Sequence, residues 1–145
     1  MRVFLAGIMQ GSIVHNDVHA QSYREFLTDL LRTNVDAVDV FDPWAVYPNS
    51  HEYEEALVRD VLLANIAEAA RSDLVVAYLP QASMGTALEM WEAYHQGRPV
   101  ITISPLVHNW VIKGLSTRVL ADLAEFRTFV ESGEFERVLR ATNNA

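Results

Sequence analysis

Residues 74–89 read LVVAYLPQASMGTALE, and this stretch carries the clearest architectural signal in the chain. The nearly unbroken apolar run 74–79 indicates a strand that is buried on both faces, as in a parallel sheet. A short loop follows, and a helical pattern runs from about Gly85 to His95. One carboxylate, Glu89, lies in that helix among apolar neighbours. A buried strand that leads through a short loop into a helix is a typical unit of a parallel α/β fold.

The rest of the chain continues this alternation of apolar runs and helical patterns. It implies right-handed crossovers and an α/β, doubly wound parallel sheet of about five strands with helices on both faces. No linker or repeat interrupts the chain, so we expect a single domain over residues 1–145. Strands are predicted at 3–7, 35–41, 74–79, 100–103 and 119–120, helices at 19–32, 51–71, 85–95 and 123–139, a loop or short helix at 104–116, and an irregular tail at 142–145.

The composition excludes several classes of function. Of the 145 residues, 50% are hydrophobic, which is enough for a packed core. The chain has no cysteine, which excludes disulfides and thiolate catalysis and fits a reducing cytoplasm, the expected location. The formal net charge is −8 and the basic residues are scattered, so no nucleic-acid partner is expected. No apolar run approaches the ~20 residues of a membrane span, so no membrane partner is expected either.

In a doubly wound fold, ligands bind beyond the carboxyl ends of the strands. Ser83 and Gly85 lie in such a loop, where the first backbone N–H groups of a helix are unpaired and can bind a hydroxyl or phosphate oxygen. Glu89 follows about one turn later. The residues alone leave open whether it is a solvated carboxylate or a functional one. His15 and His19 have the spacing of a helical metal pair but lack a third ligand, so no metal is expected.

Four segments resemble the nucleoside 2-deoxyribosyltransferase family, which includes the nucleoside 5′-monophosphate N-glycosidases. The resemblance covers about residues 3–112 and is fairly specific in the Ser-x-Gly-x-x-x-Glu pattern. It implies a flavodoxin-like fold, no metal or organic cofactor, and a small-molecule nucleoside or nucleotide and a free base as ligands. The segments are Phe4-Leu-Ala-Gly7, Asp73-Leu-Val-Val-Ala, Gln81-Ala-Ser-Met-Gly-Thr-Ala-Leu-Glu89 and Gly97-Arg-Pro-Val100.

The resemblance implies that Glu89 is the nucleophile, attacking the anomeric carbon to form a glycosyl ester. Such an adduct splits one difficult displacement into two easier ones, and the configuration is retained. The helix N-terminus is expected to help keep Glu89 ionised. We therefore expect transfer of 2-deoxyribose between bases. The alternatives are hydrolysis of a nucleoside 5′-monophosphate and, in another class, a non-catalytic nucleotide-binding module.

Ser83 occupies the position that divides the family. Transferases usually carry Asp there, on the sugar 5′-hydroxyl, whereas the monophosphate glycosidases carry Ser, on the 5′-phosphate. Ser83 can also serve a bare hydroxyl, or act as a plain helix cap. The first loop, with Gly7 and Gln10, suits a sugar or base but lacks the arginine with which the monophosphate glycosidases contact phosphate. The sequence therefore favours the hydroxyl by a narrow margin.

Asn65 stands eight residues before Asp73, where the family commonly has an acid that contacts the base. Asn can hydrogen-bond a base or sugar but cannot supply a proton, so another group, water or the base itself must provide it. Residues 104–112 match a region that reaches a neighbouring subunit's active site in the family. Asn109 and Trp110 are thus expected to bind substrate across the interface of a homo-oligomer, a dimer or larger; the alternative is an ordinary packed loop.

Overall fold

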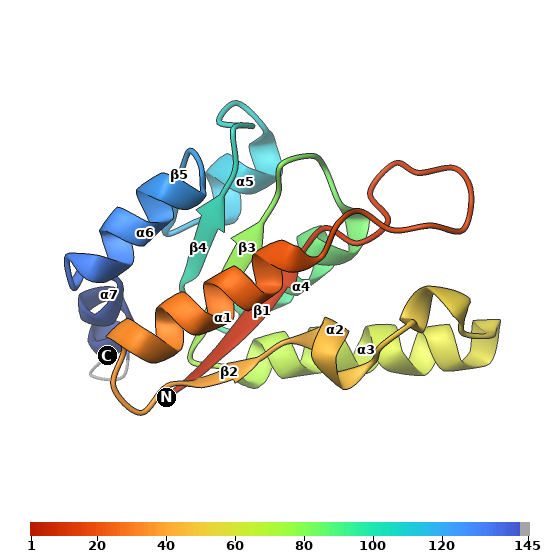
Figure 1. Cartoon of the computed structure of the whole chain (residues 1–145), viewed down its shortest axis with the longest axis horizontal. Helices are drawn as coiled ribbons and strands as arrows, with labels where there is room; N and C mark the ends of the chain where they lie inside the picture. The colour runs from red at the N-terminus through yellow and green to blue at the C-terminus, as the bar shows by residue number, and fades with distance from the viewer. Residues whose placement is uncertain (143–145) are drawn as a thin grey trace.

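The computed structural model describes residues 1–142, and its five strands form one parallel sheet in the order β2-β1-β3-β4-β5 (Figure 1). This order confirms the predicted doubly wound architecture and is that of flavodoxin-like folds. The predicted strand positions are confirmed for four of the five strands to within about one residue. The strands are β1 (Arg2–Gly7), β2 (Asp39–Phe41), β3 (Leu74–Tyr78), β4 (Val100–Ile103) and β5 (Arg118–Leu120).

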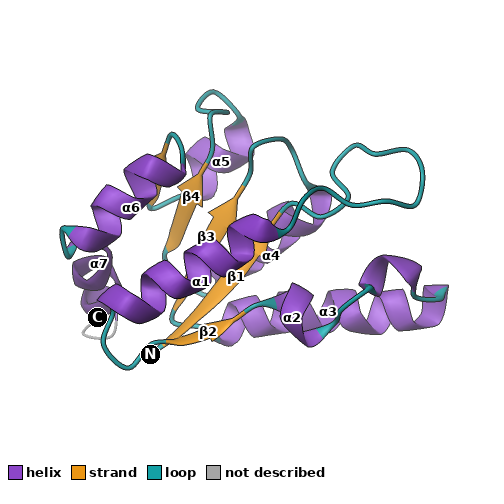
Figure 2. Ribbon diagram, viewed as in Figure 1, coloured by secondary structure: helices purple, strands orange, loops and turns teal. Residues whose placement is uncertain are grey.

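Helices cover both faces of the sheet, as Figure 2 shows. Side chains of β1 alternate between the two cores: Val3 and Leu5 pack on one side, and Phe4 and Ala6 on the other. Because successive strand residues point to opposite faces, each face receives its own apolar layer. One face carries α1 (Ser22–Asn34), α6 (Leu123–Glu131) and α7 (Glu134–Thr142); the other carries α3 (Glu55–Arg71), α4 (Met84–His95) and α5 (Trp110–Leu115).

The switch point of the sheet lies between β1 and β3. The two strands are in register, with Leu5 opposite Val76 and Gly7 opposite Tyr78. Their carboxyl ends therefore stop at the same level. The long loop after β1, seen beyond the sheet in Figure 1, and the loop that enters α4 both begin here. Ligands of doubly wound sheets bind at this position.

Three predicted element boundaries are wrong, and the first helix begins at Ser22 rather than at His19. The second strand was expected to begin at residue 35, but Ala37 has φ 51° and turns the chain, so β2 begins at Asp39. The last helix was expected to be continuous, but Gly133 with φ 78° separates α6 from α7. The helix expected from His51 begins only at Glu55, because the chain first forms a 3-10 turn over Ser50–Glu52.

Two further details concern segments expected to be irregular. The loop after β2 contains a short helix, α2 (Pro43–Val46), whose first turn is capped by the side chain of Asp42. Apart from Thr142, which ends α7, the tail predicted at 142–145 lies outside the described residues. Within the described part of the chain, no helix is both long and apolar enough to cross a membrane.

Candidate active site

The site begins with the local structure of the loop between β3 and α4. Ser83 has extended backbone and is the N-cap of α4. Its Oγ accepts hydrogen bonds from the backbone N of Thr86 at 3.5 Å and from the Thr86 hydroxyl at 3.1 Å. The hydroxyl hydrogen of Ser83 is therefore free to be donated elsewhere. The cap starts a helix that carries Glu89 in its second turn, on the side facing the sheet.

Glu89 is a buried carboxylate, with only 8% of its surface exposed. Among residues 1–142 it has no hydrogen-bond or salt-bridge partner. Burial raises the pKa of Glu89 from 4.5 to about 8, and the positive charge of Arg24 lowers it in part. The help expected from the helix N-terminus does not outweigh this burial, because Glu89 lies beyond the first turn of α4.

Six of the eight predicted site residues line one cavity of about 200 Å³, which we call the central cavity. They come from the loop after β1, the buried side of α3 and the start of α4. The structure thus brings together segments separated by more than fifty residues of sequence. These residues are Gly7, Gln10, Asn65, Ser83, Gly85 and Glu89.

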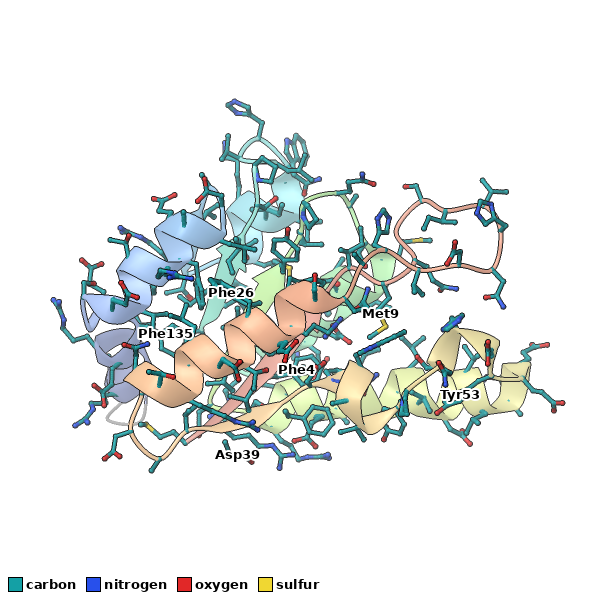
Figure 3. The ribbon with its side chains drawn as sticks, viewed as in Figure 1. Phe4, Met9, Phe26, Asp39, Tyr53 and Phe135 are labelled. Atoms are coloured by element: carbon teal, nitrogen blue, oxygen red, sulfur yellow. The ribbon has the colours of Figure 1, made fainter. Side chains whose placement is uncertain are left out.

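A second cavity adjoins the central one on the α3 side, and we call it the His51 cavity. It measures about 220 Å³ and shares Gln10 and Asn65 with the central cavity. Met9 and Tyr53, both labelled in Figure 3, line it from the loop after β1 and from the segment ahead of α3. Asn65 Oδ1 and His51 Nδ1 are buried without a hydrogen-bond partner. These polar groups make this side of the site suited to a hydrogen-bonding ring.

A third cavity adjoins the central one on the α5 side, and we call it the Ile112 cavity. It measures about 360 Å³ and shares Gly11, Ser83 and Met84 with the central cavity. Its remaining lining is mostly aliphatic. Among the described residues that line the three cavities, Glu89 is the only carboxylate and none is Lys or Arg.

Asn109 and Trp110 do not line the central cavity. Asn109 lines the Ile112 cavity, and its Oδ1 caps α5 by accepting from the backbone N of Val111 at 3.0 Å and of Ile112 at 3.3 Å. Trp110 is 89% exposed and lines none of the three cavities. Within one copy of the chain, the structure does not bring Trp110 to the central cavity, so its role across an interface stays a prediction.

Sequence reasoning missed a buried arginine beneath the site. Arg24 is 2% exposed, and its guanidinium donates to Asp42 Oδ1 at 2.8 Å and to Gln21 Oε1 at 2.7 Å. It also donates to the carbonyl oxygens of Leu5 at 3.3 Å and Gly7 at 3.1 Å. Arg24 therefore holds the end of β1 and the loop after β2 together. The sequence contained a signal, because a charge fell on the apolar stripe of α1.

Tyr23 holds the same strand end. Its hydroxyl donates to the carbonyl oxygen of Ile8 at 3.0 Å, and burial raises its pKa, so it stays protonated. A Cβ on Gly7 would collide with the Tyr23 ring, so only glycine fits there. The wall of the central cavity at Gly7 is thus set by packing from α1.

The described residues contain no group of three or more His, Asp or Glu side chains that could hold a metal ion. His19 Nε2 is buried without a partner, but it lies against Gly11 rather than beside another metal-binding side chain. The chemistry that the site offers is that of a single carboxylate with hydroxyl and amide groups around it.

No protein-family model matches the sequence, and no curated protein matches it. Solved structures do. A 2-deoxyribosyltransferase from the psychrotolerant bacterium Bacillus psychrosaccharolyticus has a TM-score of 0.69 and 19% identity, covering 95% of this chain and 96% of that one. A conserved protein from Enterococcus faecalis V583 has a TM-score of 0.60 and 18% identity, with coverage of 91% and 98%.

FerB, a flavoenzyme NAD(P)H:(acceptor) oxidoreductase from Paracoccus denitrificans, has a TM-score of 0.53 and 11% identity, with coverage of 99% and 97%. At these identities the similarity establishes the fold and not the activity. The first of the three neighbours carries the activity for which the family resembled by the sequence is named. The chain therefore has the α/β fold of a 2-deoxyribosyltransferase.

Proposed function

We propose that this protein is an enzyme that cleaves the N-glycosidic bond of a nucleoside through Glu89 and transfers the 2-deoxyribosyl group to a second base. The observation that carries the proposal is the unpartnered, buried Glu89 on the wall of the central cavity. Burying a carboxylate without a partner is costly, and such groups gather at functional sites. The fold shared with a 2-deoxyribosyltransferase supports the same activity.

In the proposed reaction, a carboxylate oxygen of Glu89 attacks C1′ of the sugar. The electron pair of the C1′–N bond passes to the base nitrogen, which takes up a proton as the base leaves. A nitrogen of a second base then attacks C1′ of the ester, gives up its proton to water, and releases Glu89 as a carboxylate. Two displacements at C1′ give net retention. Only the ionised form of Glu89 is nucleophilic, so the raised pKa limits the active fraction near neutral pH.

Asn65 and Gln10 are the proposed contacts to the base, since both line the central cavity and the His51 cavity. Asn65 cannot protonate the departing base. Water entering from the open side of the cavities is the proposed proton source. The role of Asn65 is therefore to orient the base by hydrogen bonding, and the unpartnered Oδ1 gives it an acceptor for a base N–H group.

Gly85 is the proposed point of closest approach between backbone and sugar. It lies in the first turn of α4. A Cβ placed there would meet no atom of another segment within 4 Å, so packing does not require glycine. The space that the missing side chain leaves belongs to the central cavity. A sugar that contacts the backbone accounts for the choice of residue.

A sugar with a free 5′-hydroxyl is favoured over a 5′-monophosphate. Ser83 offers one hydroxyl hydrogen, which suits a neutral oxygen as well as a charged one. The described residues lining the three cavities include no Lys or Arg to pair with a phosphate. Arg24 is buried and already bound to Asp42, so it is not available. Phosphate recognition commonly relies on Arg or Lys side chains.

We also propose that the protein assembles as a homo-oligomer in which Asn109 and Trp110 reach a second copy's site. Adjacent helices α3 and α4 carry many exposed apolar side chains, more than a monomer commonly leaves in contact with water. The exposed side of α5 adds to this surface. The residues concerned, leaving out those that line the three cavities, are Leu57 and Leu63 of α3, Leu88, Trp91 and Tyr94 of α4, and Trp110 of α5.

The test is incubation with each 2′-deoxynucleoside and a second free base, followed by chromatography. We expect a new nucleoside that contains the second base, and an ester adduct on Glu89 by mass spectrometry. Glu89→Gln should form neither, whereas Glu92→Gln, on the same helix, should retain both. Binding without turnover would favour the non-catalytic module, and turnover of 5′-monophosphates alone would favour the hydrolase.

A further inference from the structure

We infer that the Ile112 cavity binds an uncharged, apolar substituent on the 5′ position of the sugar, so that 5′-substituted nucleosides are preferred over those with a bare 5′-hydroxyl. The inference rests on the proposed function, because it takes C1′ to lie at Glu89. It goes further by naming which class of nucleoside the site accepts.

The direction of the substrate follows from the chemistry of the two outer cavities. C1′ carries the base, and C5′ lies at the opposite end of the sugar. The His51 cavity presents the rings of His51 and Tyr53 and the amide of Asn65, which suit stacking on and hydrogen bonding to a base. The Ile112 cavity offers few polar groups, which suits the other end of the molecule.

The lining of the Ile112 cavity defines the substituent. Its polar side chains are Ser12, Ser83 and Asn109, and none of its described residues is charged. Asn109 already uses its Oδ1 to cap α5. A phosphate would lose hydration here without gaining a cation. The aliphatic members are Leu79, Ala82, Met84, Ala87, Leu106, Val111 and Ile112.

The size of the cavity argues in the same direction. It measures about 360 Å³, against about 200 Å³ for the central cavity, so a lone 5′-hydroxyl would leave most of it unoccupied. Each CH₂ group buried in an apolar site raises affinity about fourfold. Ser83 stands at the junction of the two cavities, with its hydroxyl hydrogen free for the 5′-oxygen of an ether.

The test compares kcat/KM for the four 2′-deoxynucleosides, their 5′-O-butyl ethers and their 5′-monophosphates. For the accepted base, the ether should exceed the unsubstituted nucleoside by about tenfold or more, and the monophosphate should be the poorest of the three. Ala87→Leu fills the Ile112 cavity and should bring the ratio of ether to unsubstituted nucleoside close to one. Ala124→Leu, an exposed alanine on α6, is the control and should keep the wild-type ratio.

An ether that is no better than the unsubstituted nucleoside, or a preference that survives in Ala87→Leu, would overturn the inference. If no nucleoside is turned over, it is the proposed function that fails. In that case, calorimetric affinities of the same ethers and nucleosides for wild type and Ala87→Leu test the role of the cavity separately. The wild type should then bind the ether more tightly than the unsubstituted nucleoside, and Ala87→Leu should bind the two about equally.

Discussion

Replacing Glu89 by Gln should remove the loss of stability that the wild type suffers between acidic and neutral pH, while it abolishes turnover. Glu89 is 8% exposed, and burial raises its pKa from 4.5 to about 8, partly opposed by Arg24. The folded-state pKa is thus above the unfolded-state value, and the unfolded chain releases its proton first as the pH rises. Protonated Glu89 makes its full contribution to the free energy of unfolding below pH 4.5. This contribution is lost progressively as the pH rises toward the folded-state pKa of about 8.

The size of the effect follows from the two pKa values. Each pH unit between them removes about 1.4 kcal/mol from the free energy of unfolding. From pH 4.5 to pH 7 the wild type therefore loses roughly 3 kcal/mol that the uncharged Gln variant keeps. A buried amide has its own constant cost, so the expected quantity is the change with pH in the difference between the two proteins. Between pH 4.5 and pH 7, the free energy of unfolding of the variant should rise relative to that of the wild type by roughly 3 kcal/mol.

The assay is urea unfolding of wild type and variant at several pH values from 4 to 8.5. Glu92→Gln is the matched control. Glu92 lies on the partly exposed side of the same helix, where it accepts a hydrogen bond from Gln96. The difference in free energy of unfolding between Glu92→Gln and wild type should change little from pH 4 to 8.5. A Glu89→Gln curve that runs parallel to wild type from pH 4 to 7 would refute the argument that Glu89 is held neutral by burial.

Four further predictions concern catalysis and assembly. The kcat/KM of the wild type should rise with pH, with the midpoint of the rise near pH 8, as Glu89 ionises; a profile that is flat from pH 6 to 9 would contradict this. Arg24→Met should move that rise to higher pH, because it removes a positive charge that lowers the Glu89 pKa, and Arg24→Lys should move it less. Ser83→Asp should retain activity on nucleosides with a 5′-hydroxyl, whereas a wild type that prefers monophosphates and loses this preference in the variant would reverse the assignment. Light scattering should find at least a dimer, and Trp91→Glu on the exposed apolar surface should shift it toward monomer; a fully active wild-type monomer would refute the shared site.

Local sequence patterns were sufficient for the elements nearest the site. The apolar run at 74–79 and the Ser83 cap are both short-range signals, and both are seen in the structure. From them the position of Glu89 in the second turn of α4 follows directly. The start of β2 was different, because residues 35–38 are apolar enough for a strand, and only the left-handed turn at Ala37 stops them from joining it. Apolar patterns do not report turn geometry.

The buried charges required knowledge that a sequence pattern does not contain. The pairing of Arg24 with Asp42 depends on β2 lying next to β1, which is a property of the sheet order. The ionisation of Glu89 depends on how completely the loops and α3 cover it. The position of Glu89 near the start of a helix predicts that the helix dipole lowers its pKa. The sequence does not tell how large this effect is compared with desolvation, which raises the pKa.

The departures from local rules in this chain converge at one end of the sheet. A carboxylate on the apolar side of α4, an arginine on the apolar side of α1, and an amide oxygen without a partner on α3 all lie around the carboxyl ends of β1 and β3. A buried group without a partner lowers the stability of the folded state, and a buried ion pair such as Arg24 with Asp42 adds little net stability. Natural sequences break several local rules together mainly where a site requires it. The same burial that makes Glu89 costly also leaves its carboxylate, once ionised, without a hydrogen-bond donor from residues 1–142 in competition with a substrate, which favours its action as a nucleophile.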